Sequence, residues 1–215
     1  QVHCNNASVP ELTFTTNRSG GTTTYAWTNS NTAIGLGASG TGNLPGFTAT
    51  NSGTAPISAT ITVTPTFTNG GQSCSGPSQT FTITVNPTAL VNKPADQVRC
   101  NNASVPALVF TTNRSGGTTT YAWSNDNTAI GLGASGTGNL PAFTATNSGT
   151  APISATITVT PTFTNGGQSC SGPSQTFTIT VNPTPALSST LTPADRCSNT
   201  TFAYTPTSLT AGTAF

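Results

Sequence analysis

The chain has 215 residues, of which 33% are hydrophobic and only 4% are charged, and its formal net charge is +1. This near-neutral balance supplies no basic surface for nucleic acid or for an anionic membrane. No apolar stretch approaches the roughly 18 residues of a membrane-spanning helix, so we expect no membrane span. Threonine, glycine, proline and asparagine abound while helix formers are scarce, and this composition predicts an all-β protein.

Short strand patterns separated by Gly- and Asn-rich turns follow one another along the first part of the chain. The predicted strands are Leu12–Thr16, Thr23–Asn29, Phe47–Thr50, Ile57–Thr64, Thr66–Thr68 and Gln79–Asn86. Their regular spacing is typical of a sandwich of two antiparallel sheets.

Threonine occupies every second position from Thr60 to Thr68 in the segment SATITVTPTFT, and QTFTITV at 79–85 repeats the alternation. Successive strand residues point to opposite faces, so one face is apolar and the other carries threonine. The two segments are predicted to pair antiparallel, with a bulge or a change of partner at Pro65. The threonine face could bind ice or carry glycans. We favour the solvent face of a sheet, because sandwich sheets twist and the ladder is confined to a few strands.

The sequence repeats itself at a spacing of 96 residues. Residues 1–88 and 97–184 differ at six positions: His3/Arg99, Glu11/Ala107, Thr13/Val109, Thr28/Ser124, Ser30/Asp126 and Gly46/Ala142. A period of this size fits a globular domain. The predicted domains are residues 1–96 with a linker at about 87–96, residues 97–193 with a linker at about 183–193, and residues 194–215 as the start of a truncated third copy. We therefore expect a tandem array that continues in a longer protein.

Each complete copy holds two cysteines, one at its start and one in the turn before its last strand. In an immunoglobulin-like sandwich the first strand begins at the pole where the last loop also lies. This geometry predicts the disulfides Cys4–Cys74 and Cys100–Cys170, with the partner of Cys197 outside the chain. Such bonds indicate an oxidising, extracellular location.

The inventory of reactive side chains argues against an enzyme. His3 is the single histidine and is replaced by arginine in the second copy, while Glu11 is replaced by alanine. No cysteines or histidines have metal-ligand spacing, and Asp96 and Asp195 are solitary carboxylates, so we expect no cofactor, metal or calcium site.

Two further groups of residues could carry a function. Tyr25 and Trp27, with Tyr121 and Trp123, could stack on carbohydrate, but we favour the core aromatics of a sandwich. Five Asn-x-Ser/Thr sequences are candidate glycosylation sites, namely Asn6, Asn17, Asn102, Asn113 and Asn199.

The Tyr-x-Trp strand, the segment ATITVTPT and the closing pattern GxxCSGPSQTFTITVNP, in tandem layout, resemble a known family. They are similar to the PKD-like, immunoglobulin-like repeats of giant cell-surface adhesins in Bacteroidetes, the SprB-like adhesins. The resemblance covers both complete copies, although the chain lacks the Asp/Gly-rich loop of typical PKD domains. It implies type IX secretion, an extended filament attached to the outer membrane, and a role in adhesion or gliding motility.

Three functions follow from these observations as hypotheses. The leading one is a structural stalk or spacer whose partners are the neighbouring repeats. The second is a weak binding module for surface glycans or abiotic surfaces in each copy, at residues around Thr28–Gly46, acting by avidity. The third is a pilin-like subunit that self-associates into filaments.

Overall fold

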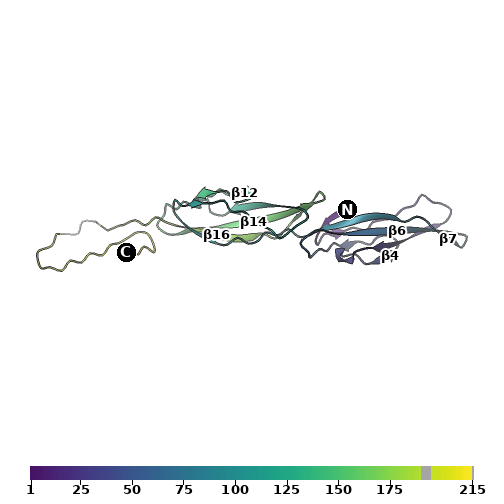
Figure 1. The fold of residues 1–215 in the computed structure, drawn as a ribbon, viewed down its shortest axis with the longest axis horizontal. Coiled ribbons are helices and arrows are strands. Elements are labelled where there is room, and N and C mark those ends of the chain that lie inside the picture. Colours follow the sequence, from purple (N-terminus) through teal and green to yellow (C-terminus); the bar gives the residue numbers. More distant parts are fainter. Residues whose placement is uncertain (190–194, 215) are drawn as a thin grey trace. The chain divides into compact units, whose positions relative to one another are not determined.

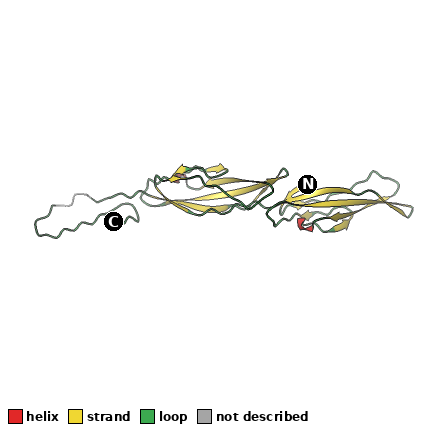
Figure 2. Cartoon of the chain, viewed as in Figure 1, coloured by secondary structure: helices red, strands yellow, loops and turns green. Residues whose placement is uncertain are grey.

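The computed structural model describes residues 1–189 and 195–214 and shows an all-β protein (Figures 1 and 2). Residues 190–193 of the predicted second linker, and residues 194 and 215 of the predicted third copy, lie outside the described residues. The strands form two sandwich-like sheet pairs, each made of a six-stranded sheet and a two-stranded sheet.

The first sheet pair contains strands β1 to β8. Their bounds are β1 (Val2–Cys4), β2 (Ser8–Val9), β3 (Thr22–Asn29), β4 (Ser39–Thr41), β5 (Phe47–Thr48), β6 (Ile57–Asn69), β7 (Gln72–Ser75) and β8 (Gln79–Asn86). The large sheet has the order β1-β8-β6-β3-β4 with β7 beside β6, and β2 pairs with β5. A short 3₁₀ helix, η1 (Thr32–Ile34), follows β3.

The second sheet pair repeats this order. Its elements are β9 (Gln97–Cys100), β10 (Ser104–Val105), β11 (Thr118–Asn125), η2 (Thr128–Ile130), β12 (Ser135–Thr137), β13 (Phe143–Thr144), β14 (Ile153–Asn165), β15 (Gln168–Ser171) and β16 (Gln175–Asn182). The large sheet has the order β12-β11-β14-β16-β9 with β15 beside β14.

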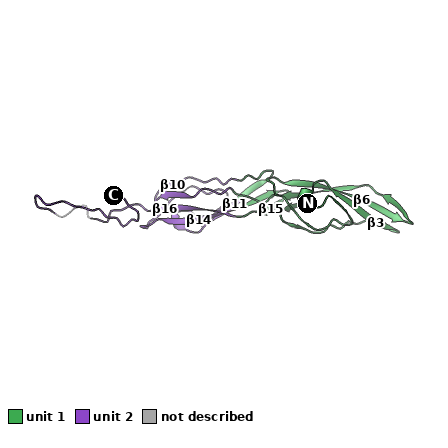
Figure 3. Cartoon of the chain, turned by 90° about the horizontal axis from the view of Figure 1, so that it is seen from below, with its two compact units in different colours: residues 1–91, 112–120, 160–173 green, residues 92–111, 121–159, 174–215 purple. Residues whose placement is uncertain are grey.

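The described chain divides into two compact units whose limits differ from those of the sequence copies (Figure 3). Unit 1 consists of residues 1–91, 112–120 and 160–173. Unit 2 consists of the remaining described residues. Unit 1 therefore contains residues 1–91 of the first copy together with two segments of the second copy, residues 112–120 and residues 160–173, which include the β14–β15 turn.

The threonine ladder lies on β6 and β8, which pair antiparallel with Thr60 opposite Thr82. This pairing confirms the prediction. The intervening side chains Ala59, Ile61 and Val63 are buried in the core of unit 1. The predicted change of partner at Pro65 is also confirmed, because β8 pairs with β6 as far as Val63 and β7 pairs from Thr66 onward.

Several strand boundaries differ from the predictions. Residues 57–69 form one strand, because β3 pairs along the other edge of β6 through Pro65 and keeps it continuous. Leu12–Thr16 forms a single bridge from Leu12 to Leu44 rather than a strand. The short strands β1, β2, β4 and β7 were not predicted, since two to four residues carry little periodic signal.

Asp96 holds one end of the sheet in unit 2. The backbone N–H of Thr178 in β16 donates to its carboxylate at 2.7 Å. This bond, more than the opposing effect of desolvation, keeps the pKa of the exposed Asp96 carboxyl below its ordinary value of 3.8. The Asp96 side chain therefore accepts a hydrogen bond from the backbone of strand β16.

Because the pKa of Asp96 is depressed in the folded state, its contribution to stability should be complete above pH 3.8 and lost as the pH falls through the lower folded value. The amide of Asp96→Asn cannot titrate. We therefore expect the stability of this variant to fall less between neutral and strongly acidic pH than that of the unmodified protein. Thermal unfolding midpoints between neutral and strongly acidic pH test this. An unchanged acid dependence in the variant would contradict the assignment.

Candidate functional site: the disulfide cluster of unit 1

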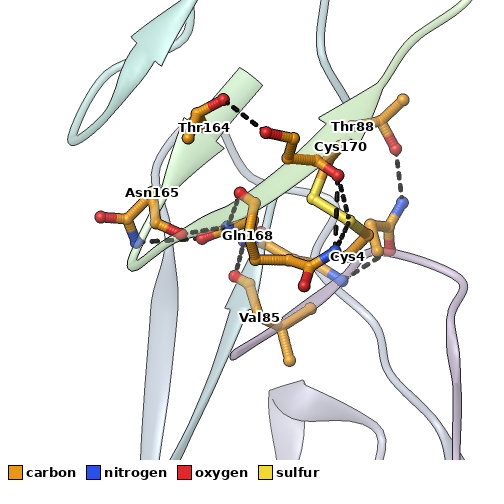
Figure 4. The surroundings of a disulfide bond; sticks show 11 residues. Cys4, Val85, Thr88, Thr164, Asn165, Gln168 and Cys170 are labelled. Carbon is orange, nitrogen blue, oxygen red and sulfur yellow. Dashed lines mark hydrogen bonds between the residues drawn. A yellow bond between two sulfur atoms is a disulfide. The ribbon is translucent and has the colours of Figure 1, made fainter. Parts of the chain in front are cut away.

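A disulfide joins β1 to β15 within unit 1 (Figure 4). It links Cys4 to Cys170, which are 166 residues apart in sequence, with their Cα atoms 5.5 Å apart. Closing a loop of this size stabilises the folded chain by about 5 kcal/mol in the chain-entropy model. The bond fits a secreted or extracellular protein, because disulfides persist in oxidising compartments.

The predicted pairs Cys4–Cys74 and Cys100–Cys170 are wrong. Strand β1 runs parallel to β8 and places Cys4 opposite Asn86, at the end of β8, whereas Cys74 lies opposite Phe67 near the far end of β6 (Figure 1). Val85 lies opposite Ile57, so ten residues of β6 separate the two positions. At about 3.3 Å per residue this is roughly 33 Å, far beyond the roughly 7 Å that a disulfide tolerates.

The other cysteines of the described chain are free thiols. Cys74, Cys100 and Cys197 are exposed. Because every complete copy has one cysteine at its start and one in its turn, the sequence pattern suits pairing within a copy and pairing across copies equally. Only the positions of the strands distinguish the two.

Asn86 forms a polar clamp beside the disulfide and is fully buried. Its side-chain nitrogen donates to the carbonyl oxygens of Asn165 at 3.0 Å and Gln168 at 3.3 Å. In return, the side-chain nitrogen of Asn165 donates to the side-chain oxygen of Asn86 at 3.0 Å. The buried amide therefore uses both its donors and its acceptor, which removes the desolvation cost of burying it.

Arg114 forms a second clamp in unit 1. Its Nε donates to the carbonyl oxygen of Thr88 at 2.8 Å, and its Nη1 donates to that of Gly53 at 3.0 Å. Beside it, the backbone N–H of Ser115 donates to the carbonyl oxygen of Thr54 at 3.0 Å. Hydrogen bonds from a charged guanidinium are stronger than neutral ones, so this contact orients as well as holds the segment.

Close packing completes the site. A Cβ atom added to Gly172 would collide with the carbonyl oxygen of Ala89. Ala89 itself is fully buried and Val91 is 2% exposed. Glycine is needed at position 172 because only it permits this approach. We call the residues of this site the disulfide cluster: Cys4, Asn86, Thr88, Ala89, Arg114, Asn165, Cys170 and Gly172.

Identical residues of the two sequence copies differ in burial, depending on whether they lie at the disulfide cluster. Phe163 is fully buried, whereas its counterpart Phe67 is only partly buried. Cys170 is 3% exposed, whereas Cys74 is exposed. Since the surrounding sequences match, the difference arises from the segments that pack against the β14–β15 turn in unit 1.

The cluster holds segments together and has no arrangement of reactive groups. Among residues 1–189 and 195–214, no three His, Cys, Asp or Glu side chains form a possible metal site. His3 lies beside the disulfide in sequence, with its Nε2 3.2 Å from Gln1 Oε1. Partial burial, and to a smaller degree the N-terminal charge, lower the pKa of His3.

The predicted aromatic residues lie in or beside the two cores. Trp27 is 4% exposed and Trp123 is 6% exposed. Tyr25 and Tyr121 are partly buried, and each ring contacts a phenylalanine ring with centroids 5.5 Å and 5.6 Å apart. Desolvation raises the pKa of Tyr121.

The candidate glycosylation residues Asn6, Asn17, Asn102, Asn113 and Asn199 are all exposed. Asn6, Asn102 and Asn199 have left-handed backbones, with φ between 65° and 68°. Asparagine tolerates this conformation better than most residues, which gives these three positions a structural use of their own. Glycosylation at the five residues stays a prediction.

No family model matches the chain, and no curated protein matches it. In the part of the chain that the structure describes, no helix is long and apolar enough to cross a membrane.

Removing the disulfide should destabilise unit 1 strongly. We expect Cys170→Ser to lower the free energy of unfolding by about 2–5 kcal/mol, because the unfolded chain regains the entropy of an open loop. Urea denaturation of the oxidised protein measures the change. The matched variant Cys74→Ser removes an exposed free thiol and should change stability by less than about 0.5 kcal/mol. Equal effects of the two substitutions would contradict the observed pairing.

The close approach at Gly172 provides a second test. We expect Gly172→Ala to cost about 1–3 kcal/mol, since its methyl group must displace the backbone of Ala89. The counterpart Gly76→Ala should cost less, because its methyl group would lie 3.1 Å from the Pro65 ring and 3.8 Å from the Pro65 carbonyl oxygen, without the backbone collision that Gly172→Ala creates. Urea denaturation of both variants measures the difference, and a larger loss at Gly76 would refute this account.

Proposed function

We propose that the chain is a stalk or spacer segment of a secreted surface filament that supports adhesion or gliding motility. In this proposal each 96-residue copy is an immunoglobulin-like, PKD-like sandwich in a tandem array. The filament extends from the outer membrane and holds a binding tip away from the cell. The resemblance to repeats of Bacteroidetes surface adhesins supports the proposal, and so do the near-identical copies.

The observation that carries the proposal is the disulfide cluster. The Cys4–Cys170 bond joins the start of the first copy to the β15 strand of the second copy, and both residues belong to unit 1. A spacer that bears tension must keep its length under load. A bond across this many residues prevents the enclosed chain from extending even when its strands separate.

The alternative of a glycan-binding module in each copy has one observation in its favour. Unit 1 has a groove of about 710 Å³ lined by residues that include Phe14, Tyr25, Gln79 and Phe81. Aromatic rings beside an amide could bind a sugar. However, Phe110 and Phe177, the counterparts of Phe14 and Phe81, are 5% and 1% exposed. Binding by avidity requires the same open site in each copy, so we favour the spacer.

Single-molecule stretching of the chain by its termini tests the spacer function. The disulfide should lock the residues between Cys4 and Cys170, so the oxidised chain should extend about 600 Å less than the reduced chain, at up to 3.6 Å per residue. The Cys74→Ser variant should behave like the unmodified chain. Equal full extension under oxidising and reducing conditions would overturn the proposal.

A further inference from the structure

The start of the third copy is held in unit 2 by a hydrogen bond that also holds the start of the second copy in unit 1. The backbone N–H of Ala211 donates to the carbonyl oxygen of Thr150 at 2.8 Å. One repeat earlier, in unit 1, the backbone N–H of Ser115 donates to the carbonyl oxygen of Thr54 at 3.0 Å. Both partners are displaced by the same 96 residues, so this contact between consecutive copies is itself repeated.

A side-chain contact between consecutive copies is repeated as well. The hydroxyl of Thr210 donates to the carbonyl oxygen of Thr184 at 3.3 Å in unit 2. In unit 1 the guanidinium of Arg114 donates to the carbonyl oxygen of Thr88 at 2.8 Å. Thr210 stands one repeat after Arg114, and Thr184 stands one repeat after Thr88. The third copy therefore keeps this hydrogen bond even though the donor side chain has changed.

Unit 1 has a second contact between consecutive copies, formed by the β14–β15 turn. The turn supplies Cys170 to the disulfide with Cys4, and its backbone carbonyl groups accept hydrogen bonds from the side chain of Asn86. The corresponding turn one copy earlier, between β6 and β7, has the identical sequence TNGGQSCSGP at 68–77. Both complete copies thus carry the turn residues that form this contact.

Unit 2 contains the groups that bind such a turn, next to the start of the third copy. Cys100 and Asn182 correspond to Cys4 and Asn86. They line a hollow of about 390 Å³ together with residues 210–213 of the third copy. Cys100 is an exposed free thiol. Within residues 1–189 and 195–214, the side-chain amide of Asn182 takes part in no hydrogen bond.

We propose that the first cysteine of each copy forms a disulfide with the turn cysteine of the next copy, all along the array. Cys4–Cys170 is one such bond. Cys100 bonds the turn cysteine of a complete third copy, and Cys74 bonds the first cysteine of a preceding copy. This pairing rests on the tandem array of the proposed function and specifies which copies are covalently joined.

The proposed bonds enclose overlapping parts of the chain. Cys100 lies between Cys4 and Cys170 in the sequence, so its bond to the next copy begins inside the loop that Cys4–Cys170 closes. Between the first and the last bonded cysteine of the array, every residue then lies inside at least one closed loop. Pulling on the ends of the array therefore cannot draw it out to the full length of its chain.

Each bond forms by oxidation of two thiols. The two cysteines lose two electrons and two protons as the sulfur–sulfur bond forms. A small-molecule disulfide such as oxidised glutathione accepts them by thiol–disulfide exchange and leaves as two thiols. The bond forms between cysteines that the folded copies hold within disulfide distance, roughly 7 Å between Cα atoms.

A chain with one more copy tests the pairing. In this extended chain residues 1–96 are present twice in succession before residues 97–215, so both junctions have the same linker. It has seven cysteines, two more than the original. After refolding with oxidised glutathione we expect two disulfides, from the first Cys4 to the second Cys74 and from the second Cys4 to Cys170. Three thiols then stay free, as in the original chain.

Alkylation followed by measurement of the intact mass counts the free thiols. One added group for each free thiol gives an expected total of three. Five free thiols in the extended chain, which correspond to the Cys4–Cys170 bond alone, would overturn the proposal.

One substitution, made in either of the two copies of residues 1–96, separates pairing across copies from pairing within a copy. Cys74→Ser in the second copy should leave four free thiols, because the first Cys4 loses its partner. Cys74→Ser in the first copy should leave two, because it removes a thiol that was already free. Pairing within the first copy predicts the reverse, and this result or equal counts would contradict the proposal.

The close approach at the turn gives a test that does not depend on counting thiols. In the oxidised extended chain, Gly76→Ala in the second copy should lower the urea midpoint more than Gly76→Ala in the first copy. Only the second Gly76 follows a copy whose Ala89 carbonyl it can approach, as Gly172 approaches Ala89 in unit 1. Equal shifts of the two midpoints would refute the proposed contact.

The spacer function and the pairing fail in different experiments. Stretching of the original chain tests the spacer function through the Cys4–Cys170 bond alone. A free first Cys4 in the extended chain would overturn the pairing even if that bond limits extension as expected. Equal extension of the original chain under oxidising and reducing conditions would overturn the spacer function even if the extended chain forms both disulfides.

Discussion

The parallel pairing of β1 with the second half of β8 determines the rest of the site. It places Cys4 at the end of β8, next to Asn86 and directly before the segment that contains Thr88 and Ala89. Cys74 is then too far away along β6 to form a disulfide with Cys4. The cysteine, the buried amide and the tightly packed backbone lie together because one short strand runs parallel to its neighbour.

The internal repeat separates the effect of sequence from the effect of environment. Phe67 and Phe163 have matching neighbours in the sequence, yet only Phe163 is fully buried. Asn86 is fully buried and clamped, while Asn182 is partly exposed. These differences arise from packing between distant segments. One copy therefore serves as a control for the other. Phe67 and Asn182 show how exposed these residues are where no distant segment packs against them.

Local patterns predicted the longer strands well and the site poorly. The bounds of β8 and the antiparallel pairing of β6 with β8 follow from alternating threonine and apolar residues. The change of partner at Pro65 follows from its missing N–H. The Arg114 clamp and the close approach at Gly172 have no local signal, because Arg18 and Gly76 occupy the same sequence environment without those contacts.

The sequence by itself determined the all-β class, the 96-residue repeat, the alternation of the main strands and the number of cysteines available for pairing. These features depend on side-chain chemistry and short-range geometry. Only the tertiary structure decided which cysteines meet and which copies of identical residues are buried. Disulfide partners must lie within a few ångströms, and the direction and register of β1 against β8, which no local pattern specifies, set that distance.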